Sequence, residues 1–294
     1  MSSPESSSPP GAVEMVVEPR VRPVGAGEVR RLLPFRKRRM VGPYTFLDVM
    51  GPDQLAAGAA MNVDAHPHIG LSTLTYLFEG RIVHRDSVGS VQAITPGAVN
   101  WMTAGSGITH TERSHPDDVP TSRTSHGLQM WVALPVESED GPPGFEHCAV
   151  DDVPETRYGE VTVRLAVGTG FGMAAPIPGS SPLILAELVL GGGAIRVDDS
   201  HTERAVLALD DGLTIDGSRL PEGRLAILEP GATPELRGAG RAVVIGGEPV
   251  GERFIWWNFV HSARDRIDAA KADWMAQRFP RVPDDHDPWV PLPA

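Results

Sequence analysis

The chain has 294 residues, of which 41% are hydrophobic, so it is long enough for one large or two ordinary domains with proper cores. A formal net charge of -12 disfavours direct nucleic-acid binding, and no run of about 18 apolar residues is present that would predict a membrane span. A single cysteine, Cys148, excludes a disulfide framework and thiolate-rich metal sites, so we expect a soluble protein of the reducing cytoplasm.

The beginning of the chain is Ser/Pro-rich and then changes to a pattern typical of β structure. Residues 1–14 have few apolar side chains and are expected to form a disordered tail, with structure beginning near Val16. From there to Val250, short apolar runs alternate with turn residues, which are abundant because the chain has 32 glycines and 28 prolines. Many short strands with frequent turns predict an all-β sandwich, jelly roll or barrel.

A basic run lies near the start of the expected ordered part. We interpret it as a solvated edge that pairs with nearby acidic residues, and we keep open that it meets an acidic ligand or partner. The run consists of Arg30, Arg31, Arg36, Lys37, Arg38 and Arg39.

The stretch from Pro135 to Asp152 combines Pro, Gly and acidic residues, which indicates a linker between two halves. The halves echo one another in the spacing of their turn residues, since an acidic residue with glycine is followed in each half by Pro-Gly, at residues 79–80 and 96–97 and again at residues 211–212 and 230–231. This echo predicts a duplicated β-barrel.

We therefore expect a first barrel over residues 15–140 and a second over residues 141–294. Only the first half carries paired metal-ligand residues. In the second half His201 and Glu203 stand without a partner pair, so we expect that domain to be metal-free.

One short helix is expected near the C-terminus. Residues 262–278 are rich in helix formers, with Ser262 placed as N-cap and Pro280 as a stop. Its apolar stripe, which we expect to pack on a barrel wall, is formed by Ile267, Ala270 and Trp274.

Two pairs of potential metal ligands are the most specific feature of the sequence. His66 and His68 flank a proline, and His110 and Glu112 flank a threonine. On a strand, side chains two residues apart point to the same face, so neighbouring strands would bring three imidazoles and one carboxylate together. This predicts a mononuclear site for Fe, Mn, Co, Ni, Cu or Zn, either closed and structural or open and able to support chemistry.

The residues before the second pair suggest a shaped pocket. Gly105 and Gly107 permit a bend that aims the following ligands inward, although a plain turn is equally compatible. Trp101, Met102 and Phe78 are candidate walls of a substrate pocket, although such side chains also fill ordinary cores.

Other histidines and one aspartate stand outside the pairs. His84, His115 and His126 are further candidates, and we expect His115 to lie at the surface or next to a ligand. Asp86 could orient a ligand histidine, but we interpret it as an exposed loop carboxylate.

Seven segments in fixed order carry a likeness to a known family: residues 41–52, 66–70, 73–80, 96–97, 100–105, 107–112 and 127–132. They include HPHIG around the first ligand pair and NWMTAG before the second. From about residue 16 to its end, the chain resembles the pirin family of the cupin superfamily.

The resemblance implies a bicupin, in which two antiparallel β-barrels lie side by side and the first holds one metal ion, usually iron. The ligands would be the residues at His66, His68, His110 and Glu112, and the ion would most often be Fe(II). Some pirins resemble quercetin 2,3-dioxygenases and open a flavonol ring with O₂. Others are described as regulators that bind transcription factors or metabolic enzymes.

One position departs from the pattern. Cupin dioxygenases and several pirins have a glutamate four residues after the second histidine of the first pair, where this chain has Ser72. A glutamate there would be the natural base for a flavonol hydroxyl, and serine cannot take that role. Glu112 is then the candidate catalytic base.

Three functions remain open from the sequence. A metal-dependent dioxygenase acting on a small aromatic substrate predicts a roomy, dry cavity over the metal. A metal-dependent regulatory protein with a protein partner predicts a narrow or water-filled cavity and an exposed patch nearby. A structural metal predicts closed four-coordination and loss of folding on chelation.

Overall fold

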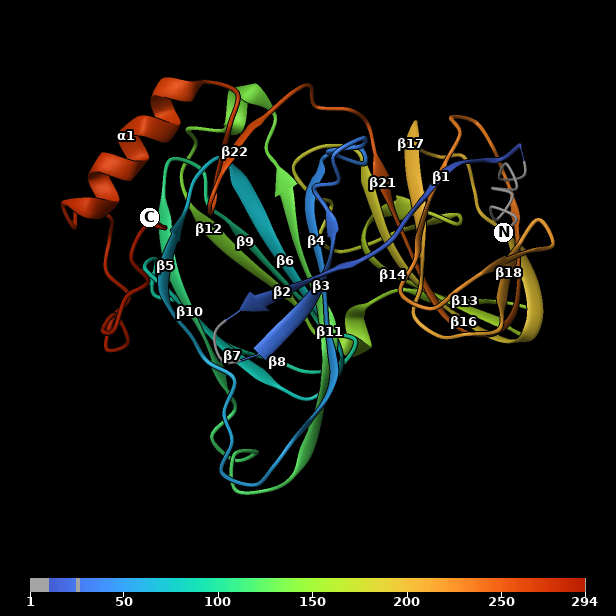
Figure 1. Ribbon diagram of the computed structural model, residues 1–294, viewed down its shortest axis with the longest axis horizontal. Coiled ribbons are helices and arrows are strands. Elements are labelled where there is room, and N and C mark those ends of the chain that lie inside the picture. The colour runs from blue at the N-terminus through green and yellow to red at the C-terminus, as the bar shows by residue number, and fades with distance from the viewer. Residues whose placement is uncertain (1–10, 25–26, 294) are drawn as a thin grey trace, which may run out of the picture.

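The computed structural model describes residues 11–24 and 27–293 of the chain. Within them, nearly all regular structure is antiparallel β, arranged as two cupin domains side by side, with one α-helix, α1 (Arg264–Met275), at the outer edge of the first domain (Figure 1). The expected all-β bicupin with a short C-terminal helix is confirmed. No helix in these two ranges has the length and hydropathy needed to cross a membrane.

The first domain is a jelly roll made of two facing sheets. Its larger sheet has seven strands in the order β12 (Gly144–Cys148), β9 (Val99–Thr103), β6 (Leu71–Glu79), β11 (Arg123–Ala133), β4 (Tyr44–Leu55), β3 (Gly27–Leu33) and β2 (Arg20–Val24). Its smaller sheet has four strands in the order β5 (Val63–His68), β10 (Ile108–Ser114), β7 (Ile82–Asp86) and β8 (Val91–Ile94). Since side chains alternate across each strand, every strand of the larger sheet sends one set of residues into the domain and the other set outward.

The second domain is built from one long, folded sheet of ten strands. Its order along the main path is β1 (Val13–Val17), β20 (Leu225–Leu228), β17 (Glu203–Ala208), β21 (Glu235–Gly247), β16 (Leu183–Arg196), β14 (Val161–Gly170) and β13 (Glu155–Tyr158). Three short strands attach at its margins, β15 (Met173–Ala174), β18 (Leu213–Ile215) and β19 (Ser218–Leu220). The two longest strands, β16 and β21, pair along their length with an irregularity between Gly191 and Ala194, and apolar side chains such as Leu165, Leu188 and Val206 fill the interior.

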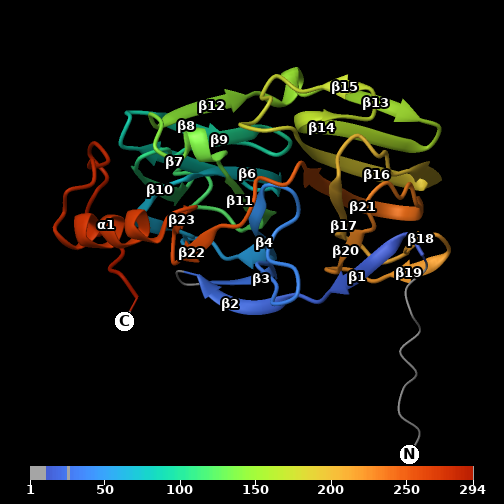
Figure 2. The ribbon, with the colours of Figure 1, turned by 90° about the horizontal axis from the view of Figure 1, so that it is seen from above.

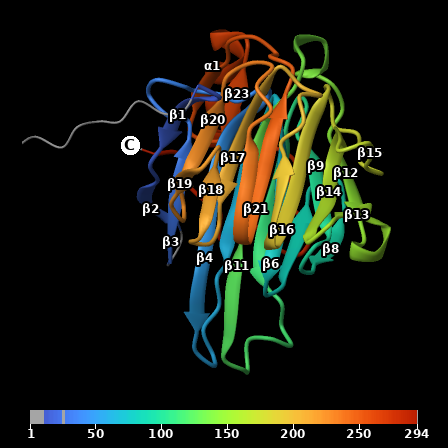
Figure 3. The same cartoon turned by 90° about the vertical axis from the view of Figure 1, so that its right-hand side faces the viewer.

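The two domains share one hydrophobic core. The outward set of the larger first-domain sheet, for example Leu74 and Leu128, packs with Leu207 and Val243 of the second domain. Figure 3 shows the strands of the two sheets overlaid face to face. The two domains therefore bury one face of each sheet against the other.

The ends of the chain cross between the domains. Strand β1 pairs with β20 of the second domain, with Val13 opposite Leu228, so the first strand within the described residues begins three residues before Val16 and includes positions 13 and 14 of the expected tail (Figure 2). Residues 1–10 of the expected tail lie outside the described residues. After the second domain the chain returns to the first, as the hairpin β22 (Phe254–Trp256) and β23 (Phe259–His261), helix α1 and a final extended segment.

Helix α1 is shorter than the sequence predicts. It begins after Ala263, because Ser262 donates its hydroxyl to Glu139 instead of capping the helix, and it ends at Met275 before Pro280 is reached. The predicted stripe is buried as expected and packs around Ile69 of the first domain; it consists of Ile267, Ala270 and Trp274.

The stretch between the domains is more structured than a linker. It contains two 3-10 turns, η1 (Val136–Ser138) and η2 (Val150–Asp152), on either side of β12. Because β12 pairs with β9, residues 144–148 belong to the larger sheet of the first domain.

Half of the basic run forms ion pairs. Arg31 pairs with Asp48 inside the first domain. Two further pairs reach the second domain, Arg30 with Glu222 and Arg38 with Glu203. These ion pairs add polar contacts at the margin of the shared core.

Candidate metal centre and its cavity

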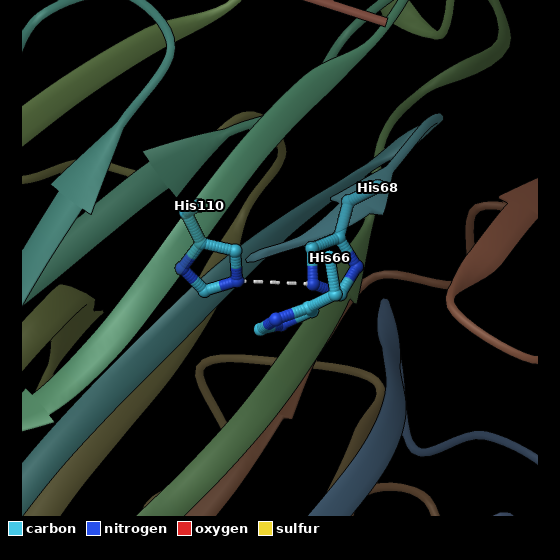
Figure 4. Close-up of side chains that lie close together, drawn as sticks. All are labelled: His66, His68 and His110. Carbon is cyan, nitrogen blue, oxygen red and sulfur yellow. Dashed lines mark hydrogen bonds between the residues drawn. The ribbon is translucent and has the colours of Figure 1, made fainter. Parts of the chain in front are cut away.

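Strands β5 and β10 bring three of the four predicted ligands together. In their antiparallel register His110 lies directly opposite His66, and His68 follows on the same face of β5. Each of the three imidazoles offers one nitrogen atom within 4.8 Å of the others (Figure 4). The three rings are only 8%, 1% and 1% exposed for His66, His68 and His110.

Two of these rings are oriented by backbone carbonyls. His66 donates its Nδ1 hydrogen to the carbonyl oxygen of Asp64 at 2.8 Å, and His68 donates its Nδ1 hydrogen to that of Asn258 at 3.0 Å. A carbonyl oxygen only accepts, so the Nε2 atoms of both rings keep their lone pairs. The Nε2 atom of His110 lies 3.2 Å from that of His68.

The protonation of the rings suits a cation. Burial lowers the pKa of His66 to about 4, and burial together with the neighbouring His66 lowers the pKa of His68 and His110 well below the usual value. The rings are therefore neutral at pH 7 and offer lone pairs. Converging neutral imidazoles of this kind fit a first-row divalent metal ion.

The fourth predicted ligand, Glu112, lies in the same cavity but outside the histidine cluster. The reason is the strand register: His68 is opposite Ile108 and Glu112 is opposite Val63, so the two residues sit at opposite ends of the row. Burial raises the pKa of Glu112. Within the described part of the chain, no hydrogen bond to its carboxylate lowers this pKa again. Glu112 is thus part of the cavity lining and not of the three-histidine cluster.

Behind His110 lies a buried histidine and aspartate pair. His84 is 4% exposed and its Nε2 atom lies 3.0 Å from Oδ2 of Asp86, which is fully buried. Asp86 was expected to be an exposed loop carboxylate, and that prediction is wrong because β7 places it opposite His110. Burial acts to raise the pKa of Asp86, but hydrogen bonds from His84 and the Ser90 backbone outweigh it and hold this pKa below its ordinary value.

A cavity of about 660 Å³ opens above the histidines, between the two sheets of the first domain. This volume falls within the range of small-molecule sites. One wall is the smaller sheet with the cluster and Glu112, and the opposite wall is the larger sheet with Asp48, Gln129 and Trp131.

An aromatic stack forms that opposite wall. Phe46 and Trp131 are cross-strand neighbours whose rings stack with centroids 4.0 Å apart, and the rings of Trp131 and His68 meet edge to face with centroids 5.3 Å apart. Arg31 lies over the Phe46 ring at 4.3 Å and is held there by two hydrogen bonds of 2.8 Å to Asp48. Arg31, Phe46, Trp131 and His68 therefore form one continuous row of contacts that fixes this wall beside the cluster.

The three predicted pocket walls do not line this cavity. Phe78 and Trp101 point outward from the larger sheet into the core shared with the second domain, and Met102 is buried in the apolar cluster around Phe46 and Trp131. Trp101 and Met102 are consecutive on β9 and so face opposite ways: Trp101, like Phe78, lies on the outward face, whereas Met102 lies on the inward face but is covered within its apolar cluster. The polar Gln129 next to apolar neighbours on β11 was the available signal, because it marks the set that faces the cavity.

Ser72 also points away from the cavity. Its hydroxyl lies 3.1 Å from that of Thr103, and the residue is fully buried. The departure from the cupin pattern at this position therefore takes no side chain out of the cavity. Gly105 and Gly107 do form the expected bend, with φ angles of +51° and +153° before β10.

The returning C-terminal segment completes the site, which the sequence pattern did not reveal. Trp257 and Val290 line the cavity, and Asn258 supplies the carbonyl that orients His68. The final segment hydrogen-bonds to β5 through Val290 and Ala65 at 2.8 Å. The contact between His68 and Asn258 spans 190 residues of sequence, so no local motif could predict it.

The remaining histidines lie apart from the cluster. His115 is in a polar turn and accepts from the Asp117 backbone, in agreement with a surface position. His126 packs on Phe78 at the domain boundary, and burial lowers its pKa. His201 in the second domain hydrogen-bonds to the Thr169 carbonyl oxygen at 2.9 Å.

Comparisons with known proteins agree with this architecture. Residues 26–132 match the Pirin family and residues 188–280 match the Pirin C-terminal cupin domain. A pirin-like protein from Caulobacter vibrioides is 46% identical over 288 residues, covering 96% of this chain and 99% of that protein. The crystal structure of a quercetin 2,3-dioxygenase from Acinetobacter baumannii matches with a TM-score of 0.87 at 32% identity and covers 95% of each chain.

A bacterial pirin from Escherichia coli, crystallised in complex with nickel(II), shares the fold with a TM-score of 0.62 at 17% identity, covering 80% of this chain and 99% of that chain. Both halves of the sequence thus match the family, and a relative is similar over nearly its whole length. The protein is a member of the pirin family, with two cupin domains and a candidate three-histidine metal site in the first.

Proposed function

We propose that the protein is a metal-dependent dioxygenase that opens the ring of a flavonol or a similar hydroxylated aromatic substrate with O₂. The observation that carries the proposal is the position of three neutral imidazoles on one wall of a cavity of about 660 Å³ whose opposite wall is aromatic. His66, His68 and His110 would hold one divalent ion, with Glu112 as the fourth ligand or as the base. Fe(II) is the first candidate, and Mn, Ni, Co, Cu or Zn would also suit these donors.

When bound, the ion would supply a Lewis acid for a phenolic hydroxyl and redox activity toward O₂. The residues of the chain would bind the substrate and exclude water. The stacked Phe46 and Trp131 side chains, which both line the cavity, would contact a flat substrate, and the apolar walls would exclude water.

Two polar side chains are placed to handle the substrate's oxygen atoms. Burial raises the pKa of Glu112, which makes its carboxylate a good acceptor for the hydroxyl proton at neutral pH. Thr75 donates to Oε1 of Gln129 at 2.9 Å, which leaves the Gln129 amide hydrogens free to donate to a substrate carbonyl in the cavity. A hydroxyl next to a carbonyl, as in a flavonol, would match both groups.

The names of similar proteins support the substrate class, since the Acinetobacter baumannii structure is titled quercetin 2,3-dioxygenase. The alternative is a regulatory protein whose metal ion controls binding to a transcription factor or metabolic enzyme. That role predicts a narrow cavity, and the volume of about 660 Å³ favours a small-molecule site instead. A cytoplasmic location belongs to the same proposal and is supported by the single, buried cysteine.

The test is anaerobic loading with Fe(II), Mn(II), Ni(II), Co(II) or Cu(II), followed by O₂ uptake and loss of flavonol absorbance with quercetin. We expect metal-dependent turnover that His110→Ala abolishes. His115→Ala, the same substitution at a surface turn of the same domain, should retain it. No turnover with any fully loaded metal would exclude quercetin as a substrate and favour the regulatory alternative.

A further inference from the structure

A row of buried polar side chains continues from His110 away from the cavity. The Nδ1 atom of His110 lies 3.3 Å from Nδ1 of His84, and Nε2 of His84 lies 3.0 Å from Oδ2 of Asp86. The three residues are 1%, 4% and 0% exposed in that order. The row runs across neighbouring strands, because β7 pairs with β10.

The direction of each hydrogen bond follows from the fixed end of the row. Oδ1 of Asp86 accepts the backbone N–H groups of Val88 and Ser90 at 3.0 and 2.9 Å, which hold the carboxylate in place. Its Oδ2 can then only accept, so His84 carries its hydrogen on Nε2. The Nδ1 atom of His84 is left as an acceptor, and its partner must be the Nδ1 hydrogen of His110.

We propose that His84 and Asp86 are positioning residues that keep the His110 hydrogen on Nδ1, so that its Nε2 lone pair faces the metal. The inference rests on the metal site of the proposed function. His66 and His68 obtain the same orientation from backbone carbonyls, whereas His110 obtains it from a side-chain pair. Ring stacking with Phe145, at 4.6 Å and 18° between planes, fixes the His84 ring.

The competing arrangement would close the site. If the His110 hydrogen moved to Nε2, it would be donated to the Nε2 lone pair of His68, because the two Nε2 atoms are 3.2 Å apart. Two of the three ligand nitrogen atoms would then be occupied by one hydrogen bond. Partners outside the ligand shell commonly affect metal affinity by about 10- to 100-fold, so the choice of tautomer has a measurable cost.

Asp86→Asn is the most specific variant, because it keeps the size and shape of the side chain and replaces one of its two acceptor oxygen atoms by an amide donor. Val88 and Ser90 still require an oxygen at Oδ1, so the new amide nitrogen must face His84. His84 would then accept at Nε2 and carry its hydrogen on Nδ1, which drives the His110 hydrogen to Nε2. We expect the dissociation constant for Zn(II), measured by competition with a chromophoric chelator, to rise about 10- to 100-fold.

Two further variants distinguish an effect on the His110 tautomer from an effect on packing. His84→Phe keeps a ring on Phe145 without an acceptor and should weaken Zn(II) binding similarly. His84→Asn places an amide oxygen near the position of Nδ1 and should restore part of the affinity. Asp118→Asn, which changes a carboxylate paired with Arg81 elsewhere in the domain, is the matched control and should leave the affinity unchanged.

The decisive measurement is ¹⁵N NMR of the metal-free protein with labelled histidine, which reports the tautomer of each ring without turnover. We expect the hydrogen on Nδ1 of His110 in the unsubstituted protein and on Nε2 in Asp86→Asn. An unchanged His110 tautomer in Asp86→Asn would overturn the inference, even if Zn(II) affinity fell through loss of the negative charge. Failure of quercetin turnover would count against the proposed function alone, since neither readout measures oxidation.

Discussion

Arg253 and Glu139 form an ion pair with 2.6 Å between Nε and Oε1, and each side chain is only 1% exposed. The pair joins the segment after the first domain to the start of the returning C-terminal segment. Glu139 also accepts a hydrogen bond from the backbone N–H of Ser262 at 2.9 Å. One carboxylate therefore binds both Arg253 and Ser262 of the returning C-terminal segment. The segment that carries Trp257 and Asn258 to the cavity is therefore anchored at both of its ends.

Glu139→Ala should destabilise the protein strongly. The substitution leaves the Arg253 guanidinium buried without its carboxylate, and breaking a buried pair typically costs about 3–5 kcal/mol. Urea denaturation of the two proteins measures the difference. Glu137→Ala, two residues earlier and exposed, is the matched control and should change the free energy of unfolding by less than about 0.5 kcal/mol. Equal effects of the two substitutions would contradict the role of the pair.

His66→Ala should abolish tight metal binding while both domains remain folded. The imidazole is one of three converging donors, and its loss removes a ligand without touching the core shared by the domains. Metal content after dialysis measures the loss, and far-UV circular dichroism checks the fold. Stoichiometric metal retained by His66→Ala would refute the ligand set.

The metal-free protein should lose stability as the pH falls below about 6.5. The pKa of His66 is about 4 in the folded protein because of burial, and an unfolded histidine has a pKa of about 6.5. Between these values the unfolded chain binds the proton and the folded chain does not, so acidification favours unfolding. The expected loss from His66 alone is about 2 kcal/mol at pH 5, from urea titrations at pH 7.5 and pH 5.

His66→Gln is the control for this pH dependence, because it removes the titrating ring and keeps a polar side chain. Its free energy of unfolding should fall less steeply between the two pH values. Equal slopes for His66→Gln and the unsubstituted protein would show that His66 does not carry the effect.

The sequence predicted the three residues of the candidate histidine cluster because the ligand spacing is local. His66, His68 and His110 each sit on a strand, and period-two geometry dictates that each pair shares a face. The register between β5 and β10 is not local, and it decides that Glu112 lies at the far end of the row from His68. The spacing of histidines and glutamate in the sequence therefore identifies the candidate ligand residues, whereas the strand pairing determines how far apart they lie.

The cavity walls were harder to predict than the ligands. Both faces of β6, β9 and β11 are buried, one against the cavity and the other against the second domain, so burial alone does not tell Trp131 from Trp101. The contribution of Asn258 depends on a chain return that no short motif encodes. When both faces of a sheet are buried, the sequence pattern does not show which face lines the pocket.

Trp131→Leu should weaken binding of a flat aromatic ligand. The change removes the ring that stacks on Phe46 and borders His68, and such aromatic contacts contribute about 0.5–1.5 kcal/mol beyond their area. The dissociation constant for quercetin, measured by fluorescence titration of the Zn(II) protein, should rise about 3- to 10-fold. Trp101→Leu changes the same residue type on the outward face and should leave this constant unaltered. A larger effect of Trp101→Leu would mean that the ligand binds elsewhere.

Gly70→Ala should disturb both folding and the metal site. Gly70 has a φ of +67°, and a Cβ there would overlap the carbonyl oxygen of Val260 in the returning hairpin. The hairpin must shift, and with it the Asn258 carbonyl that orients His68. We expect a loss of about 2 kcal/mol or more in the free energy of unfolding, together with weaker Zn(II) binding.

Gly58→Ala separates backbone strain from this clash. Gly58 also has a positive φ, +86°, but a Cβ there would meet no atom within 4 Å. Its cost should be the conformational strain alone, about 1 kcal/mol, with unchanged Zn(II) affinity. If the two substitutions had equal effects on stability and on metal binding, the close approach of the hairpin to Gly70 would not control the site. A selective effect of Gly70→Ala on metal binding would instead show that the C-terminal return holds His68 in its ligating orientation.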